Sequence, residues 1–177
     1  MGVRIESLNA EQTADCRAQL IFLLQDSVDG GASVGFLPPL STSEASLYWD
    51  GVTAAVRDGL RVLLVAIADD WRIVGTAQLA LEARPNGVHR AEVAKVMVLG
   101  RARRQGIARA LMAAIEEHAR RQGRTTLVLD TLRGDPAERL YEATGYTYVG
   151  SIPAYARTAE GALAATAVYY RLLDTGA

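Results

Sequence analysis

The stretch that decides the fold is Val96-Met-Val-Leu-Gly-Arg-Ala-Arg-Arg-Gln-Gly106-Ile-Ala108. Its β-branched start predicts a strand, its basic middle predicts a turn, and an amphipathic helix is predicted to follow. Such a turn exposes backbone N–H groups at a helix N-terminus, where the helix dipole also favours negative charge. Because Gly106 and Ala108 lack bulk, a phosphate can approach the main chain. Charge-assisted donors come from the nearby arginines, Arg101, Arg103, Arg104 and Arg109. These features predict a pyrophosphate site.

Length and composition indicate one globular domain that spans residues 1–177. Half of the residues are hydrophobic, which is enough for a buried core. The formal net charge of −1 provides no overall field that would attract nucleic acid or an anionic membrane. The single cysteine excludes an internal disulfide, and no residues have metal-ligand spacing, so no metal is expected. With neither an apolar leader nor a membrane-spanning stretch, we expect a cytoplasmic protein.

Hydrophobic periodicity and capping signals predict elements in the order β-α-α-β-β-β-α-β-α-β-β. Asn9 with Gln12, and Ser41 with Glu44, have the spacing of capping boxes. Strands are predicted at residues 3–8, 61–68, 73–81, 90–99, 125–130, 146–152 and 164–173, and helices at 10–29, 42–59, 107–122 and 136–144. Hairpins join the early strands, whereas the helix after residue 99 crosses over to a parallel neighbour. We therefore predict an α/β fold with a mixed, mostly antiparallel sheet and helices on both faces.

The pattern Arg103-x-x-Gly106-x-Ala108 after a Val-x-Val strand resembles the acyl-CoA-binding motif of the GNAT family of N-acetyltransferases. The order of elements is similar to that family along essentially the whole chain. The resemblance implies that strands 92–99 and 125–130 splay apart, with the pantetheine arm of acetyl-CoA in the gap against the main chain of Met97 and Val98. The residues it implies for binding acetyl-CoA are Met97, Val98, Arg103, Arg104, Gln105, Gly106, Ile107, Ala108 and Arg109. Core packing is the simpler role for the valines, and both roles can hold.

The segment Ala137-Glu-Arg-Leu-Tyr141-Glu-Ala-Thr-Gly145-Tyr146 resembles the family helix with the pattern A-x-x-L-Y-x-x-x-G-F. In the family this tyrosine protonates the departing CoA thiolate, which implies the role of general acid for Tyr141. The alternative is a half-buried helix tyrosine whose hydroxyl bonds to a backbone group. Tyr146 stands where phenylalanine is usual, and Asp130-Thr131 stands where many members have asparagine.

Glu92 and Asp130 are the candidates for the catalytic base, because an amine acceptor must lose a proton before it attacks a thioester. Strand alternation predicts that Glu92 shares a face with Val96 and Val98, and Asp130 is predicted to end the neighbouring strand. Both carboxylates could instead bind a cationic substrate. The structural alternatives are an ion pair of Glu92 with Arg90 or Lys95, and a cap by Asp130 on the turn at Gly134.

A closer resemblance, to tabtoxin-resistance acetyltransferases, rests on five segments: Gly30–Phe36, Pro85–Gly87, Arg90–Val93, Leu129–Thr131 and Val149–Tyr155. It implies acetylation of a small β-lactam amino-acid toxin. We predict that Gly35, Phe36 and Tyr155 bind this substrate together with Glu92 and Asp130. The loop 30–39 combines glycine hinges with apolar anchors, so it could close over the substrate. Alternatively, its apolar residues only fasten it to the core.

The sequence thus predicts direct transfer of an acetyl group from acetyl-CoA to the amino group of a small molecule. Two alternatives stay open: acetylation of a protein N-terminus or lysine, and a non-catalytic acyl-CoA sensor on the same fold. We expect a small-molecule amine as the partner and neither nucleic acid nor membrane. The sequence is compatible with a homodimer and leaves the oligomeric state undecided.

Overall fold

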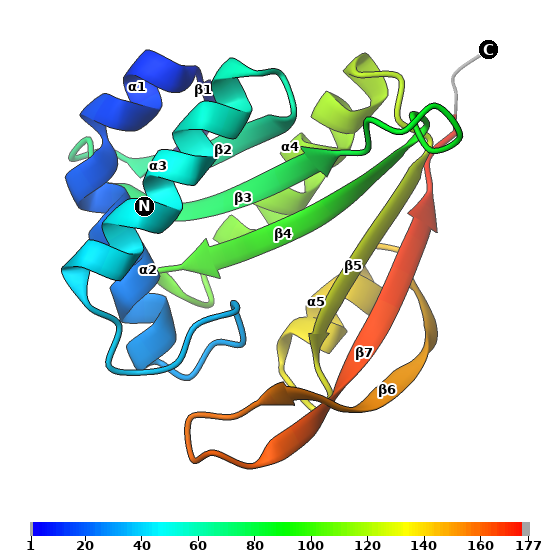
Figure 1. Ribbon diagram of the computed structural model, residues 1–177. Coiled ribbons are helices and arrows are strands. Elements are labelled where there is room, and N and C mark those ends of the chain that lie inside the picture. The colour runs from blue at the N-terminus through cyan, green and yellow to red at the C-terminus, as the bar shows by residue number, and fades with distance from the viewer. Residues whose placement is uncertain (1, 175–177) are drawn as a thin grey trace.

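The computed structural model describes residues 2–174, which form one seven-stranded sheet with helices packed against it (Figure 1). The elements are β1 (Val3–Leu8), α1 (Ala10–Asp15), α2 (Arg17–Asp29), α3 (Thr42–Arg57), β2 (Arg61–Ala68), β3 (Ile73–Leu81), β4 (Arg90–Val98), a 3₁₀ turn (Gly100–Ala102), α4 (Ile107–Arg121), β5 (Thr126–Leu132), α5 (Ala137–Ala143), β6 (Thr147–Arg157) and β7 (Leu163–Leu172). The predicted α/β order is therefore confirmed. None of the described helices is long and apolar enough to cross a membrane.

The sheet has the strand order β1-β2-β3-β4-β5-β7-β6. Within residues 2–174, β4 and β5 form the parallel pair and the other neighbours are antiparallel. Helices α1, α2 and α3 pack together on one face, and α4 packs on β2, β3 and β4 from the other (Figure 1). Gly75 lets α4 approach closely, because a Cβ there would lie 3.2 Å from a side-chain atom of Leu111. Helices on both faces are thus confirmed.

The parallel pair β4 and β5 holds together over a short stretch only. Arg90, Ala91 and Glu92 pair with Thr126, Leu127 and Val128, and beyond these pairs the two strands diverge (Figure 1). β5 pairs instead with β7 along its whole length. The predicted splaying is confirmed, and it leaves backbone groups of β4 without a strand partner on the side of β5.

A β-bulge interrupts β4 next to Lys95. Ala94 pairs with Gln78, but Met97 pairs with Thr76, so β4 contains an extra residue across this stretch. Lys95 has a left-handed φ of +52°, which residues other than glycine rarely adopt. The bulge therefore changes the direction in which the following side chains of β4 point.

Because of the bulge, the side chains before and after it do not share the faces that simple alternation predicts, and this corrects the prediction for Glu92. Gly75 faces α4 and pairs with Val98, whereas Ala80, which pairs with Glu92, lies on the opposite face of the regular part of β3. Glu92 and Val98 therefore lie on opposite faces of the sheet. The expectation that they share a face was wrong, because strand alternation does not continue through a bulge.

The remaining differences concern the ends of elements and one break within a predicted helix. Both predicted capping boxes are present, at Asn9 and at Ser41. The first predicted helix is divided at Cys16 into α1 and α2. β5 continues to Leu132 and β6 to Arg157, so each is longer than predicted. Asp130 consequently lies inside β5, where it pairs with Val168 of β7, and does not end the strand.

Candidate active site

The turn between β4 and α4 forms the start of the site. Arg104 and Gly106 both have left-handed backbones, with φ of +62° and +79°. Gly106 is the N-cap of α4, and within the described residues no side chain caps this end of the helix. The first N–H groups of α4 are therefore available to an anion, as predicted.

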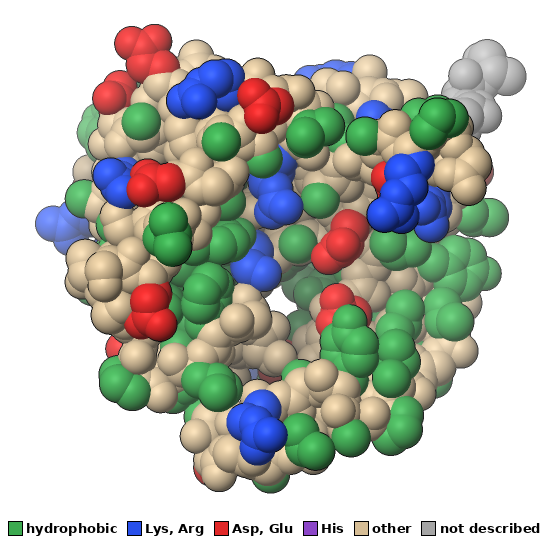
Figure 2. All heavy atoms as spheres, viewed as in Figure 1, with side chains coloured by type: hydrophobic (Ala, Val, Ile, Leu, Met, Phe, Trp, Pro, Cys, Tyr) green, Lys and Arg blue, Asp and Glu red, His purple; other side chains and the backbone are tan. Residues whose placement is uncertain are grey.

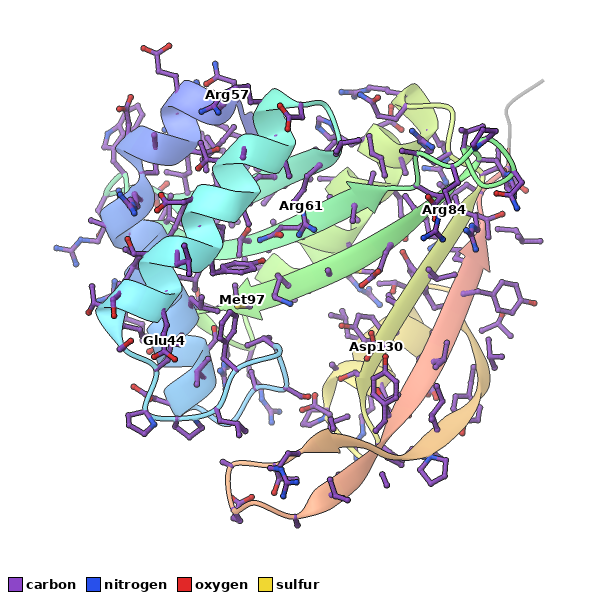
Figure 3. All side chains as sticks on the ribbon, viewed as in Figure 1. Glu44, Arg57, Arg61, Arg84, Met97 and Asp130 are labelled. Carbon is purple, nitrogen blue, oxygen red and sulfur yellow. The ribbon has the colours of Figure 1, made fainter. Side chains whose placement is uncertain are left out.

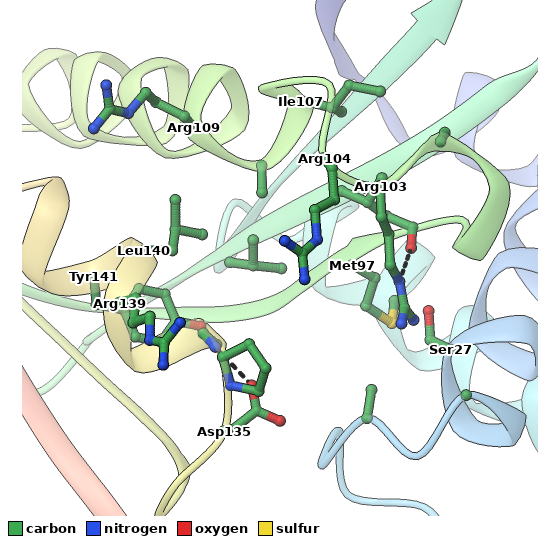
Figure 4. Close-up of a pocket in the computed structure, with 18 of the residues that line it drawn as sticks. Ser27, Met97, Arg103, Arg104, Ile107, Arg109, Asp135, Arg139, Leu140 and Tyr141 are labelled. Carbon is green, nitrogen blue, oxygen red and sulfur yellow. Dashed lines mark hydrogen bonds between the residues drawn. The ribbon is translucent and has the colours of Figure 1, made fainter.

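Beside this turn lies a cavity of about 580 Å³, here called the arginine cavity (Figure 4). It is bordered by the turn, by β4 at Val96–Val98, by the end of α2 and by α5. The residues predicted for acetyl-CoA line it, with the exception of the exposed Gln105: they are Met97, Val98, Arg103, Arg104, Gly106, Ile107, Ala108 and Arg109. The structure therefore brings together almost the whole predicted set.

Four guanidinium groups border the arginine cavity. Arg103, Arg104 and Arg109 were expected there, whereas Arg139 of α5 was missed. Figure 4 shows Arg104 and Arg139 on opposite sides of the cavity. Arg109 also donates to the carbonyl oxygen of Ala143 at 3.2 Å, which ties α4 to the end of α5. Arg139 could have been predicted to border this cavity from its position on the same short helix as Tyr141.

The main chain of β4 offers one clear binding group toward the gap. The N–H of Leu99 donates to the carbonyl oxygen of Val74 at 2.9 Å. In an antiparallel pair, the main-chain groups of alternate residues point to the same side, so those of Met97 also point toward β3 and those of Val98 point toward the gap. The Val98 carbonyl accepts from Nε of Arg103 at 3.2 Å, which leaves its N–H facing the gap. The predicted main-chain contact of Met97 is thus corrected: Met97 contributes its side chain to the cavity (Figure 4).

Tyr141 of α5 lies where the arginine cavity meets a second cavity. Its side chain is buried, and its ring packs against Tyr146 and Tyr169 with centroids 6.1 and 5.9 Å away. Burial raises the pKa of the Tyr141 phenol well above its usual range, and the carboxylates of Asp135 and Asp130 act in the same direction. The phenol is therefore protonated at neutral pH and can act as a proton donor.

The second cavity, of about 320 Å³, is here called the carboxylate cavity. Glu92 and Asp130 both line it, as predicted for a site between the splayed strands, and Asp135 and Lys95 were missed. Two of the proposed structural partners, Arg90 and the turn at Gly134, are engaged elsewhere, whereas the third, Lys95, lines the same cavity as Glu92 without forming a salt bridge among the described residues. Arg90 pairs with Glu82 at 3.1 Å, and the N–H of Gly134 donates to Glu138 at 2.6 Å.

The remaining predicted substrate residues divide between two cavities. Gly35 and Tyr155 line the carboxylate cavity and also a neighbouring cavity of about 490 Å³. Of these two cavities, Phe36 lines the neighbouring cavity and not the carboxylate cavity. Its ring meets Tyr48 of α3 edge-on, with centroids 5.3 Å apart, so this part of the loop is fastened to the core.

Charges of opposite sign face each other across the central opening. Figure 2 shows Lys and Arg side chains on one wall of this hollow and Asp and Glu side chains on the other. Figure 3 places Arg61 at the start of β2 and Asp130 on β5, on either side of the opening. The arginine cavity thus has four arginines and one carboxylate, Asp135, at its border, whereas the carboxylate cavity has two walls of different charge.

Comparison with known proteins identifies the family. The model of the acetyltransferase (GNAT) family matches residues 33–146, which include the basic turn and Tyr141. A relative from Azospirillum brasilense, an uncharacterized N-acetyltransferase in the hisH-hisA intergenic region, is 34% identical over 130 residues. That alignment covers 72% of this chain and 74% of the relative.

Solved structures share the fold at low sequence identity. An N-acetyltransferase from Staphylococcus aureus Mu50 superimposes with a TM-score of 0.81 at 17% identity, covering 98% of this chain and all of that one (100%). A phosphinothricin acetyltransferase from Sinorhizobium meliloti, solved in complex with AcCoA, gives a TM-score of 0.80 at 22% identity, covering 99% and 91% of the two chains. Together with its basic turn and splayed strands, the family match shows that the chain belongs to the GNAT family of N-acetyltransferases and is an acyltransferase.

Proposed function

We propose that this enzyme transfers an acetyl group directly from acetyl-CoA to the amino group of a small molecule. The observation that carries the proposal is the meeting of two cavities at Tyr141. One cavity is bordered by arginines and a helix N-terminus, and the other by carboxylates. A protonated phenol between them stands where an acyl donor and an amine acceptor would have to meet.

The arginine cavity has the chemistry that a CoA molecule requires. The uncapped start of α4 and the guanidinium groups of Arg103 and Arg104 would hold the pyrophosphate. The free N–H of Val98 would bind the pantetheine arm in the manner of a neighbouring strand. Acetyl-CoA supplies an activated thioester, so the protein needs to orient the acyl group and exclude water.

The reaction then needs three proton transfers, because nitrogen loses one proton before it attacks and one afterwards, and the departing sulfur gains one. The amine nitrogen forms a bond to the acetyl carbon while the carbon–sulfur bond breaks. Glu92 or Asp130, directly or through water, would take the proton that the ammonium form of the acceptor must lose. Tyr141 would give its phenolic proton to the departing sulfur, and the second proton that nitrogen loses as the amide forms would restore the phenol, directly or through water.

Two features support a small acceptor over a polypeptide. Ala32 and Gly35 of the loop after α2, and Tyr155 and Ala156 of β6, border the carboxylate cavity from opposite sides. Figure 1 shows that loop and the β6–β7 hairpin next to each other at one end of the molecule. An extended peptide would need a groove open at both ends, so this enclosure favours a compact substrate.

The finer proposal is a toxin with an amino-acid structure, acetylated for detoxification. It rests on the resemblance to tabtoxin-resistance acetyltransferases. The Sinorhizobium meliloti protein of the same fold is named a phosphinothricin acetyltransferase. A purely acyl-CoA-binding sensor is less consistent with the site, because such a protein needs neither a protonated phenol nor carboxylates in an adjoining cavity.

The test supplies the enzyme with isotopically labelled acetyl-CoA, a pool of small amines and a pool of unfolded polypeptides. Label should appear in small molecules, with release of free CoA, and Tyr141→Phe should reduce both. Label confined to lysines or N-termini of the polypeptides would refute the small-molecule acceptor. Tight acetyl-CoA binding without any release of CoA would instead establish the sensor.

A further inference from the structure

Lys95 is a charged residue in the carboxylate cavity to which the proposed reaction gives no role. It sits at the bulge of β4 with a left-handed φ of +52°. Bulges often redirect a side chain beside an active site, at a cost in backbone strain. Here the redirected side chain borders the same cavity as Glu92 and Asp130.

The ammonium group of Lys95 is partly buried without a countercharge in contact. Among residues 2–174 it forms no salt bridge, and its Nζ lies 5.7 Å from the centroid of the Tyr48 ring. Burial lowers the pKa of Lys95, and the Arg61 guanidinium adds to this effect, whereas Glu92 and Asp130 oppose it. A cation in this position gains more from an anionic ligand than an exposed lysine does, because water screens it less.

The surroundings hold Lys95 in place, together with Arg61, which borders the central opening (Figure 3) but is not among the residues that line the carboxylate cavity. The side-chain oxygen of Gln78 accepts hydrogen bonds from the Tyr48 hydroxyl, at 3.0 Å, and from Arg61. The Tyr48 ring beneath Lys95 is packed in turn against Trp49, with centroids 5.2 Å apart. The two cations therefore stand on a rigid surface, which favours binding of a ligand of defined shape.

The opposite wall of the cavity is acidic. Glu92, Asp130 and Asp135 border it, and the carboxylate of Asp130 accepts from the Thr166 hydroxyl at 3.0 Å. A ligand that fills the cavity would thus meet carboxylates on one side and an ammonium group on the other. A simple amine would pair only with the carboxylates of the acidic wall, and Lys95 would then face an uncharged part of the ligand.

We propose that Lys95 is a specificity-determining residue that pairs with an anionic group of the acceptor, while the acceptor amine lies on the side of Glu92 and Asp130. This inference rests on the proposed function and names the acceptor class: a small molecule that carries both an amine and an anion. A purely structural Lys95, stacked on Tyr48, would leave acceptor choice unaffected, so the two roles are separable by experiment.

The probe is a library of L-amino acids and the matching L-amino-acid carboxamides, in which a neutral amide replaces the carboxylate. Each member is offered with labelled acetyl-CoA, and labelled products are measured by mass spectrometry. The wild-type enzyme should prefer acids over the corresponding amides by about 10-fold or more in kcat/KM, the size expected for a charge-assisted contact. Lys95→Met should abolish this preference through a higher KM for the acids, with the rate on amides unchanged.

Three controls keep the result interpretable. Lys95→Arg retains the charge and should restore most of the preference. Arg57→Met removes an exposed cation at the end of α3, outside the three cavities described above, and should change nothing. The acetyl-CoA affinity and melting temperature of each variant show whether it is folded.

The outcomes separate this inference from the function on which it rests. Equal labelling of acids and amides by the wild type, a preference for amides, or a preference that survives in Lys95→Met would overturn the role of Lys95 while leaving the acetyltransferase intact. If acetyl-CoA binds normally but no small molecule is labelled, the proposed function and the role of Lys95 both fail.

Discussion

The arginine cavity and the carboxylate cavity meet at Tyr141 but are assembled in different ways. Half of the residues that line the arginine cavity come from one segment, the end of β4 and the turn into α4, which offers main-chain groups and a helix terminus. The carboxylate cavity collects residues from six parts of the chain, namely the loop 32–35, β4, β5, the turn before α5, α5 itself and the β6–β7 hairpin.

This difference explains which half of the site a sequence reveals. A phosphate-binding turn depends on local backbone geometry and on residues with little side chain, so it leaves a short, recognisable pattern. An acceptor cavity depends on the packing of distant segments and on which way their side chains point. We therefore expect changes in the arginine cavity to affect donor binding as a whole, and changes in the carboxylate cavity to affect acceptor choice and proton transfer.

The largest effect should come from Gly106→Glu, which should abolish acetyl-CoA binding in calorimetry. The glutamate places a negative charge and bulk where the pyrophosphate would lie. Gly106→Ala is the matched control, because it shares the strain of a φ of +79° and its methyl group would meet no described atom within 4 Å. If Gly106→Glu is folded and binds acetyl-CoA as well as Gly106→Ala does, the turn is not the donor site.

Tyr141→Phe tests the residue between the two cavities. We expect kcat to fall by about 10²-fold with nearly unchanged acetyl-CoA affinity, because a positioned acid is lost while binding contacts remain. Since the pKa of Tyr141 is raised, the wild-type rate should not decline through loss of this proton between pH 7 and pH 9.

The control is Tyr170→Phe, which removes a phenol that is 37% exposed and lies outside the arginine and carboxylate cavities. It should keep full activity. A Tyr141→Phe enzyme that turns over as fast as Tyr170→Phe would assign Tyr141 to packing alone.

Smaller effects, confined to the acceptor, should follow from Glu92→Gln and Asp130→Asn. At one or both sites we expect about a 10-fold loss in kcat/KM for the acceptor, and a pH profile shifted toward alkaline values, because the amine must then lose its proton without the carboxylate. Acetyl-CoA affinity should stay constant. Glu11→Gln, an exposed carboxylate on α1, is the control. Wild-type kinetics and pH dependence in both single variants and in the double variant would leave ordered water as the base.

The smallest effect on catalysis should come from Phe36→Ala. Because its ring packs against Tyr48 beside the core, we expect a loss of about 1–2 kcal/mol in the free energy of unfolding, less than for a fully buried phenylalanine. Acetyl-CoA affinity should be normal and the acceptor KM should change by no more than about threefold. A normal melting curve together with a strongly altered acceptor KM would show that the loop acts as a lid.

Local signals predicted much of the fold. The capping boxes at Asn9 and Ser41 and the strand order up to β4 follow from interactions within a few residues, and each is present. The ends of β5 and β6 were underestimated, since strand length depends on the partner strand β7 and not on local propensity. The division of the first helix at Cys16 had no sequence signal that we identified.

The sequence by itself determined the basic turn, the glycine at the start of α4 and the helix that carries Tyr141, because each depends on backbone preferences and contacts between near neighbours. Only the tertiary structure decided how the carboxylate cavity is charged. One extra residue in β4 reversed the alternation between Glu92 and Val98, and the same bulge turned Lys95 into the cavity opposite Asp130. A bulge arises from the pairing of two strands that are distant in sequence, and no pattern within β4 alone reports it.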